Sequence, residues 1–221
     1  TVLFEIGDVI DIYSPETMAF VDSYTITDLV KNGTGYVVTV DRRPNRDMVN
    51  FNIGNASKAT SLTLDNSLIQ HKRNRGILLQ GRNSKIINCT FRNVVMGAIQ
   101  VLAVSDQFKE AIVPQNIQIA NTKFINNVAD IRVFAYGSQG SSASLPNTIQ
   151  HVEIFNNYFF NGQGVPTYLL ACGQVTVHHN LYHYSHVNQM RIIEIRRSQD
   201  VAVENNVVYY SEGNYANVEL L

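Results

Sequence analysis

Ile86-Ile87-Asn88-Cys89-Thr90-Phe91 runs from apolar residues through a polar corner back to apolar residues, and this order recurs along the chain. Matching hexapeptides begin at Leu64, Ile119, Ile154, Val177 and Val203. When they are aligned, a polar column is followed three places later by an apolar column. The polar column is Asn66, Asn88, Asn121, Asn156, His179 and Asn205, and the apolar column is Ile69, Phe91, Phe124, Phe159, Tyr182 and Val208.

Successive members of the polar column are 22, 33, 35, 23 and 26 residues apart. A short minimal period with longer copies is typical of a β-helix, whose coils hold about three short strands and whose insertions form loops. We therefore predict an all-β fold, a right-handed parallel β-helix of the pectin-lyase-like type with about six coils over residues 61–221. Stacking at ~4.8 Å would turn the apolar column into a core and the asparagines into an amide ladder at the corners. The insertions fall at 105–114 and 138–146.

The composition agrees with a fold that has many tight turns. Of 221 residues, 45% are hydrophobic and only 16% are charged, while asparagine, which tolerates left-handed backbone, occurs 24 times. A net charge of −1 with scattered basic residues gives no nucleic-acid footprint, and no apolar run is long enough for a membrane span. The two cysteines, Cys89 and Cys172, fall in non-equivalent places, which favours isolated thiols over a disulfide.

Residues 1–60 follow a different pattern and predict a small antiparallel β subdomain. Val9–Tyr13 reads as a strand, and strands at Ser23–Thr27 and Gly35–Val40 flank Lys31-Asn32-Gly33-Thr34, a hairpin signal. We interpret Arg42–Ser57 as the connection to the helix.

Four segments carry a resemblance to a known family: Phe4-Glu5-Ile6-Gly7-Asp8-Val9-Ile10, Asn74-Arg75-Gly76-Ile77-Leu78-Leu79-Gln80, Lys85-Ile86-Ile87-Asn88-Cys89-Thr90-Phe91 and Met96-Gly97-Ala98-Ile99-Gln100-Val101. In this order the sequence resembles glycoside hydrolase family 110, the inverting exo-α-galactosidases that remove terminal α-1,3-linked galactose. The resemblance covers most of residues 4–104, and the later coils match only as a generic β-helix. It implies a glycan substrate, no cofactor, and a secreted or periplasmic location, and it leaves a homo-oligomer open.

The sequence departs from the family in two places. The family carries adjacent aspartates in an Asp-Asp…Asn-Val-His-Gly motif upstream of the β subdomain, and no such motif is present here. The family also has an aromatic-rich loop after the second coil, whereas Ser105–Glu110 is poorer in aromatic residues and the chain has no tryptophan. We therefore expect a C-terminal portion of a longer glycosidase, inactive by itself.

Candidate site residues come from a second strand that follows each corner. Its triplets centre on an outward column that we read as Leu79, Gln100, Arg132, Leu170, Glu194 and Glu219. Inverting hydrolysis needs two carboxyl groups ~6.5–9.5 Å apart, which stacked strands can supply at multiples of ~4.8 Å. We predict Glu194 and Asp130 as catalytic, and Gln100, Arg132 and Glu219 as substrate-binding. The opposing interpretation is a solvated surface column, with Asp130 as a turn residue.

The histidines His178, His179, His183 and His186 cluster in the fifth coil without a companion that completes a metal set, so we predict no metal site and read His179 as a corner residue. Several tyrosines, Tyr168 among them, offer a face for sugar stacking. Two other functions stay open, because β-helices host many activities. One is a non-catalytic carbohydrate-binding or structural solenoid of the tailspike or adhesin kind. The other is a polysaccharide lyase, which would need clustered acids beside Arg191, Arg196 or Arg197.

Overall fold

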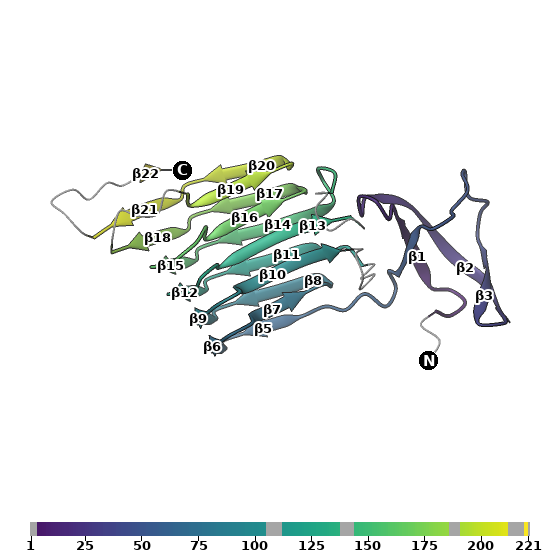
Figure 1. Ribbon diagram of the computed structural model, residues 1–221, viewed down its shortest axis with the longest axis horizontal. Helices are drawn as coiled ribbons and strands as arrows, with labels where there is room; N and C mark the ends of the chain where they lie inside the picture. The colour runs from purple at the N-terminus through teal and green to yellow at the C-terminus, as the bar shows by residue number, and fades with distance from the viewer. Residues whose placement is uncertain (1–3, 105–111, 138–143, 186–190, 212–218, 221) are drawn as a thin grey trace.

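The computed structural model describes residues 4–104, 112–137, 144–185, 191–211 and 219–220, and these residues form strands and turns without a helix. A small antiparallel sheet lies beside a stack of parallel strands (Figure 1). The stack has three sheets. The six-stranded sheet contains β5 (Thr63–Asp65), β8 (Arg82–Ile87), β11 (Gln115–Ala120), β14 (Ile149–Phe155), β17 (Cys172–His178) and β20 (Gln199–Glu204).

The other two sheets of the stack have seven and five strands. The seven-stranded sheet contains β6 (Leu68–Lys72), β9 (Thr90–Val94), β12 (Lys123–Ile125), β15 (Tyr158–Phe160), β18 (Leu181–Tyr184), β21 (Val207–Tyr210) and β22 (Glu219–Leu220). The five-stranded sheet contains β7 (Arg75–Leu79), β10 (Gly97–Val104), β13 (Ile131–Tyr136), β16 (Thr167–Leu170) and β19 (Ile193–Arg196).

The chain visits the three sheets in turn, so three consecutive strands make one coil. In the second coil, β8, β9 and β10 pair in parallel with β11, β12 and β13 of the third. Every later coil repeats this pattern as far as β20 and β21. The predicted parallel β-helix is therefore confirmed.

The apolar column forms the core, as predicted. Its members are register partners from Ile69 to Val208. The rings of Phe91, Phe124, Phe159 and Tyr182 stack with centroids 5.5, 4.8 and 4.5 Å apart. Stacked aromatic pairs contribute about 0.5–1.5 kcal/mol beyond the burial of their area, so this column stiffens the helix along its axis.

The asparagine column lies in single file along one corner, where each residue has a positive φ of 46–55°. The backbone N–H of each of the first five members donates to the main-chain carbonyl of the residue preceding the next member. This left-handed conformation costs most L-residues about 1–2 kcal/mol but suits asparagine, which explains the sequence preference. His179 has a φ of 55° and occupies the same column, so its interpretation as a corner residue is confirmed.

The predicted position of the amide ladder is wrong by one residue. The corner side chains are exposed, and the stacked amides belong to the next position, which the left-handed corner turns inward. Asn206 Oδ1 accepts bonds from the N–H and Nδ2 of Asn180, whose Oδ1 does the same for Asn157. We call this buried column the inner ladder: Cys89, Thr122, Asn157, Asn180 and Asn206.

The antiparallel sheet has the order β3-β2-β1-β4, with β1 at Val9–Tyr13, β2 at Phe20–Asn32, β3 at Gly35–Val40 and β4 at Asn52–Asn55. The predicted hairpin joins β2 and β3, with Asn32 opposite Gly35 and Gly33 at a φ of 59°. The segment that we interpreted as a connection contains β4, which pairs with β1. That correction follows from tertiary pairing, because Asn52–Asn55 has little strand character of its own.

A buried ion pair fastens this sheet to the β-helix. Arg82 on β8 binds Asp11 on β1, and Tyr13 Oη donates to Asp11 Oδ2 at 2.9 Å. Arg82 also donates to Tyr13 Oη at 2.6 Å and to the carbonyl of Val113 at 3.2 Å. Tyr13 belongs to the same buried core as the helix. Tyr13 therefore packs in the core of the β-helix, and the partly buried ion pair gives the two parts a second contact.

Candidate functional site

The outward column of the five-stranded sheet contains most of the predicted site residues. Register places Gln100 beside Arg132, Arg132 beside Tyr168, and Tyr168 beside Glu194. The prediction is wrong at two levels, because Leu78 and Tyr168 take the places assigned to Leu79 and Leu170. Leu79 and Leu170 are buried in the core. Leu79 lies beside a second leucine, so alternation of polarity gave no sign of which one points outward, and Leu170 lies two residues after the column residue of its strand.

Gln100 is buried, with 3% of its surface exposed. Its Oε1 accepts a bond from Arg75 Nε at 2.6 Å, and its Nε2 donates to the carbonyl of Met96 at 3.2 Å. Both ends of the amide are therefore engaged within the protein. The structure places Gln100 under Arg75 as a support of the sheet, rather than as an open group for a sugar hydroxyl.

Arg132 lies among aromatic rings. Its guanidinium carbon is 5.4 Å from the ring centroids of both Phe134 and Tyr168. Such cation–π contacts contribute about 0.5–1 kcal/mol at partly exposed sites and hold the guanidinium plane in a defined orientation. Burial raises the pKa of the Tyr168 phenol, and a hydrogen bond with Tyr136 acts in the same direction. Tyr168 therefore stays a neutral hydroxyl that can donate and accept.

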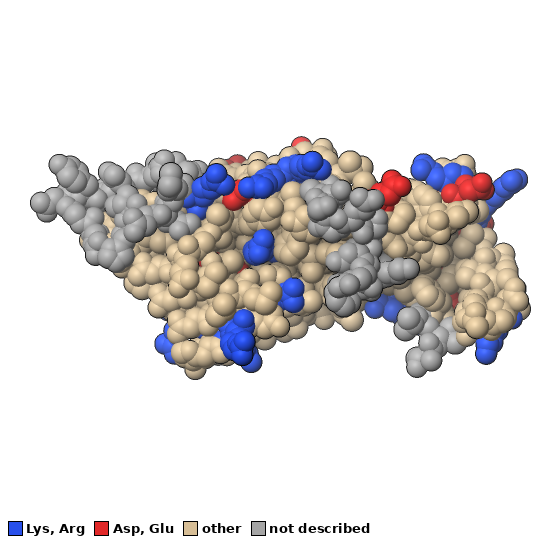
Figure 2. Space-filling model, in the orientation of Figure 1, with Lys and Arg blue, Asp and Glu red and all other residues tan. Residues whose placement is uncertain are grey.

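Glu194 lies next to Tyr168 in the outward column, on the side away from Arg132. Its side chain is 15% exposed and forms ion pairs with Arg196 and, at 3.5 Å, with Arg191. A groove of about 380 Å³ lies here, and we call it the arginine groove; it is lined by Ala129, Arg132, Val165, Tyr168, Glu194 and Arg196. Basic side chains gather along the end of the helix that β19 and β20 form (Figure 2). The groove therefore offers two guanidinium groups, one carboxylate and one aromatic face.

Asp130 lies inside the helix and not in the groove. Only 1% of its surface is exposed, although the preceding Ala129 lines the groove. Its Oδ1 accepts a bond from Asn127 Nδ2 at 2.8 Å, and burial raises the pKa of the Asp130 carboxyl to about 7. The predicted catalytic role needs contact between Asp130 and a substrate. At this interior position the carboxyl group does not reach the groove.

The predicted placement of Glu219 is wrong. We expected it to follow Glu194 in the outward column, but the backbone of β22 pairs antiparallel with β21 in the seven-stranded sheet, with Glu219 opposite Val208. The last segment therefore reverses direction instead of completing the sixth coil. Because Glu194 lies in the five-stranded sheet, the structure does not bring these two acids together.

Two groove residues, Tyr168 and Arg196, were outside the predicted site. Tyr168 stood out in the sequence only as one of several tyrosines, and Arg196 only as one of three arginines considered for a polysaccharide lyase. Tyr168 lies in line with Arg132 and Glu194, but the number of residues between the inner ladder and this column changes from coil to coil, so the sequence gave no signal for it. The ion pair of Arg196 with Glu194 joins residues two apart on β19, which the sequence alone does not reveal.

The fifth-coil histidines lie apart from the arginine groove. His178 Nδ1 is 2.9 Å from His179 Nδ1, and His178 Nε2 is 3.4 Å from Glu153 Oε1. His183 Nδ1 is 2.8 Å from Tyr158 Oη on the seven-stranded sheet. His186 is outside the described residues. Within the described ranges, no group of three or more His, Cys, Asp or Glu residues has the geometry to hold a metal ion.

No family model matches the chain, and no curated protein matches it. The resemblance to glycoside hydrolase family 110 stays a prediction. As for membranes, the described part of the chain contains no helix long and apolar enough to cross one.

Proposed function

We propose that this β-helix binds a saccharide in the arginine groove, with a terminal α-linked galactose as the first candidate. One observation carries the proposal: Arg132, Tyr168 and Glu194 occupy consecutive levels of one outward column and line the same groove. Polar and aromatic groups that converge on a concavity are the usual signature of a small-molecule site.

Each of the three side chains has a role that suits a sugar. The ring of Tyr168 gives an apolar face on which the C–H face of a pyranose can stack. Arg132 donates in a fixed fork that suits two neighbouring hydroxyl groups, and Glu194 accepts from hydroxyl donors. Because Arg132 is held over Tyr168 and Glu194 is held by Arg196, little side-chain entropy is lost on binding.

Hydrolysis is less well supported than binding. An inverting mechanism needs an acid and a base about 6.5–9.5 Å apart, and Glu194 is the single carboxylate among the described residues that line the groove. Release of galactose would require a second acid from another part of the protein. A non-catalytic saccharide-binding role is therefore the function that the described geometry supports best, and the glycosidase predicted from the resemblance is the second candidate.

The test is a titration of the protein with methyl α-galactoside and with an α-1,3-linked galactobiose, followed by NMR and calorimetry. We expect saturable binding that Arg132→Ala weakens roughly 10- to 100-fold, because charged hydrogen bonds are worth about 1.5–3 kcal/mol. Arg92→Ala is the matched control, since Arg92 lies exposed on the seven-stranded sheet and bonds Gln70.

Absence of binding to both saccharides, or equal binding by the wild type and Arg132→Ala, would overturn the proposal. The same samples show whether free galactose accumulates during long incubation. Accumulation that Glu194→Gln abolishes would favour the hydrolase over the binding module.

A further inference from the structure

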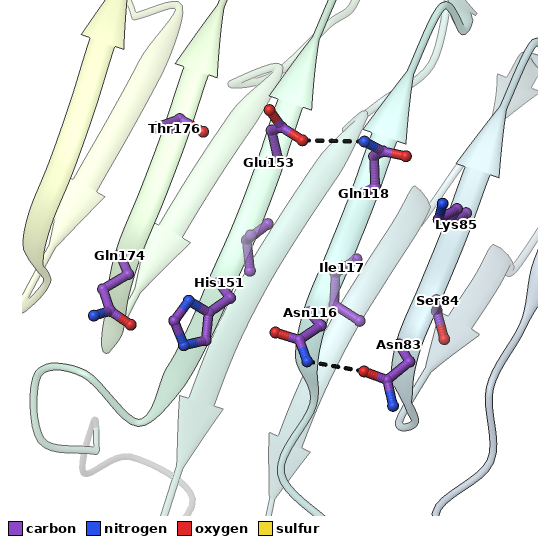
Figure 3. Close-up of a pocket in the computed structure, with 11 residues that line it drawn as sticks. Asn83, Ser84, Lys85, Asn116, Ile117, Gln118, His151, Glu153, Gln174 and Thr176 are labelled. Atoms are coloured by element: carbon purple, nitrogen blue, oxygen red, sulfur yellow. Dashed lines mark hydrogen bonds between the residues drawn. The ribbon is translucent and has the colours of Figure 1, made fainter.

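A second groove lies on the outer face of the six-stranded sheet, on a different side of the helix. It has a volume of about 420 Å³ and crosses β8, β11, β14 and β17. Two rows of polar side chains run along it, one from Asn83 to Gln174 and the other from Lys85 to Thr176 (Figure 3). We call it the amide groove; it is lined by Asn83, Ser84, Lys85, Asn116, Ile117, Gln118, His151, Val152, Glu153, Gln174 and Thr176.

The concavity follows from the backbone. Asn83, Asn116, His151 and Gln174 have φ values of 52–57°, each at the second or third position of its strand. A left-handed residue inside a strand bends it, and the register skips these residues in every coil. Because the bend repeats at each level, the hollow runs along the helix axis across four strands, a length of roughly 14 Å at ~4.8 Å per strand.

The chemistry of the lining is polar and nearly neutral. Asn116 Nδ2 donates to Asn83 Oδ1 at 2.8 Å, and Gln118 Nε2 donates to Glu153 Oε2 at 3.1 Å. These bonds link neighbouring coils and leave each amide with further donors and acceptors. Of the described lining residues, Lys85 and Glu153 are the only Lys, Arg, Asp or Glu, so their charges offset each other.

These features restrict the class of ligand. Carboxamides, hydroxyls and an imidazole both donate and accept, as do sugar hydroxyls, and they repeat along a line. A peptide that adds a strand needs a free sheet edge, but β11 and β14 are paired on both sides. An anionic polymer needs a surplus of basic groups, which the lining does not have. A linear neutral chain of hydroxyl-bearing rings meets all three conditions.

We propose that the amide groove binds a linear neutral oligosaccharide that lies along the helix axis, independently of the saccharide in the arginine groove. Successive rings contact successive coils, with Gln118 and Glu153 at the centre of the contact and the corner amides along one side. The length of the groove limits the ligand to a few rings, so longer chains gain no further contacts.

The experiment titrates the protein by calorimetry with cellotetraose, mannotetraose, maltotetraose and, as the anionic counterpart, tetragalacturonate. At least one neutral tetrasaccharide is expected to bind and to shift the side-chain amide signals of the groove in NMR spectra. Its disaccharide binds at least tenfold more weakly, and its hexasaccharide binds no more than about twofold more tightly. Gln118→Ala and Glu153→Ala each weaken binding fivefold or more.

Two controls separate this site from the arginine groove and from general effects on the fold. The first control, Gln70→Ala, removes a glutamine from the outer face of the seven-stranded sheet, and the second is Arg132→Ala. Both variants are expected to leave the affinity for the tetrasaccharide unchanged. Far-ultraviolet circular dichroism checks that each variant is folded. The proposal is overturned if no neutral tetrasaccharide binds, if tetragalacturonate binds as tightly as the best neutral one, or if Arg132→Ala abolishes the binding while Gln118→Ala does not.

Discussion

The arginine groove and the amide groove lie on two sheets of one solenoid and are built in opposite ways. In the amide groove, each coil contributes a similar polar residue at an equivalent backbone position, so its shape comes from a repeated left-handed conformation. In the arginine groove, the equivalent positions hold Arg132, Tyr168 and Glu194, and no two are of the same type.

The difference shows how a repeat protein can separate architecture from recognition. A column of like residues, such as the stacked rings from Phe91 to Tyr182, satisfies the same packing requirement at every level. A column of unlike residues has no such shared requirement, and its members contact one another through charge and ring interactions. The arginine groove therefore suits a compact ligand with distinct ends, and the amide groove suits a ligand that itself repeats.

The largest effect is expected for Asp130→Asn. This substitution tests whether Asp130 belongs to the interior of the β-helix or to the arginine groove. The folded protein holds the Asp130 proton up to a pKa of about 7, whereas the unfolded chain loses it near 3.8. The unfolded state therefore binds fewer protons between about pH 4 and pH 7, and stability falls as the pH rises through that window, by up to about 4 kcal/mol. Asp130→Asn should remove this fall and be the more stable protein at pH 8.

Urea denaturation at pH 4.5, 6 and 8 measures this effect. Asp200→Asn, a change at an exposed aspartate of β20, is the control and should keep the wild-type slope. If Asp130→Asn kept that slope as well, the interior assignment would be wrong. Loss of galactose release with unchanged stability and unchanged saccharide binding would instead support the predicted catalytic role.

A smaller effect is expected when the inner ladder is broken. Asn180→Ala removes the acceptor of the N–H and Nδ2 of Asn157 and the donor to the carbonyl of Ile154. Buried groups left without partners cost about 1–3 kcal/mol each, and partial relaxation brings the total to roughly 3 kcal/mol. His179→Asn, one residue earlier on the exposed corner, should change stability by less than about 0.5 kcal/mol. Equal losses in the two variants, measured by urea denaturation, would contradict the inner ladder.

The backbone origin of the amide groove is tested by a pair of substitutions at Asn116. Valine is disfavoured at its φ of 56° and should cost about 1–2 kcal/mol, whereas glycine adopts this conformation freely and should be nearly neutral. Thermal unfolding followed by circular dichroism measures both. A glycine variant as unstable as the valine variant would show that the side-chain bond to Asn83, and not the left-handed backbone, sets the geometry.

The smallest effect concerns the two glutamates, one in each groove. Glu194→Gln keeps an acceptor oxygen but removes the charge, so α-galactoside binding in the arginine groove should weaken by roughly threefold. Glu153→Gln makes the same change in the amide groove and should leave α-galactoside binding in the arginine groove unaltered. NMR titration resolves changes of this size. A similar weakening in both variants would mean that the two grooves are not independent.

Where the sequence interpretation failed, the failures share a cause. Leu78 and Leu79 are equally apolar, so nothing local distinguishes the inward residue from the outward one, and a shift of one residue reverses the faces. In the same way, Asn156-Asn157 and Asn205-Asn206 are pairs of identical neighbours, so the sequence did not show which asparagine of each pair forms the buried ladder. Asn52–Asn55 became a strand only because β1 offered it a partner.

The amino-acid sequence by itself determined the repeat: the apolar column, the corner asparagines and therefore the parallel β-helix. It did so because residues stacked at equivalent levels meet the same steric and packing requirements, and those requirements leave a periodic trace in the chain. Only the tertiary structure decided which neighbour of each pair faces outward, that Asp130 lies inside, that the final strand turns back, and that Arg132, Tyr168 and Glu194 line one groove. The line of Arg132, Tyr168 and Glu194 and the turn of the final strand depend on contacts between residues 11 to 36 positions apart, and such contacts leave no periodic trace.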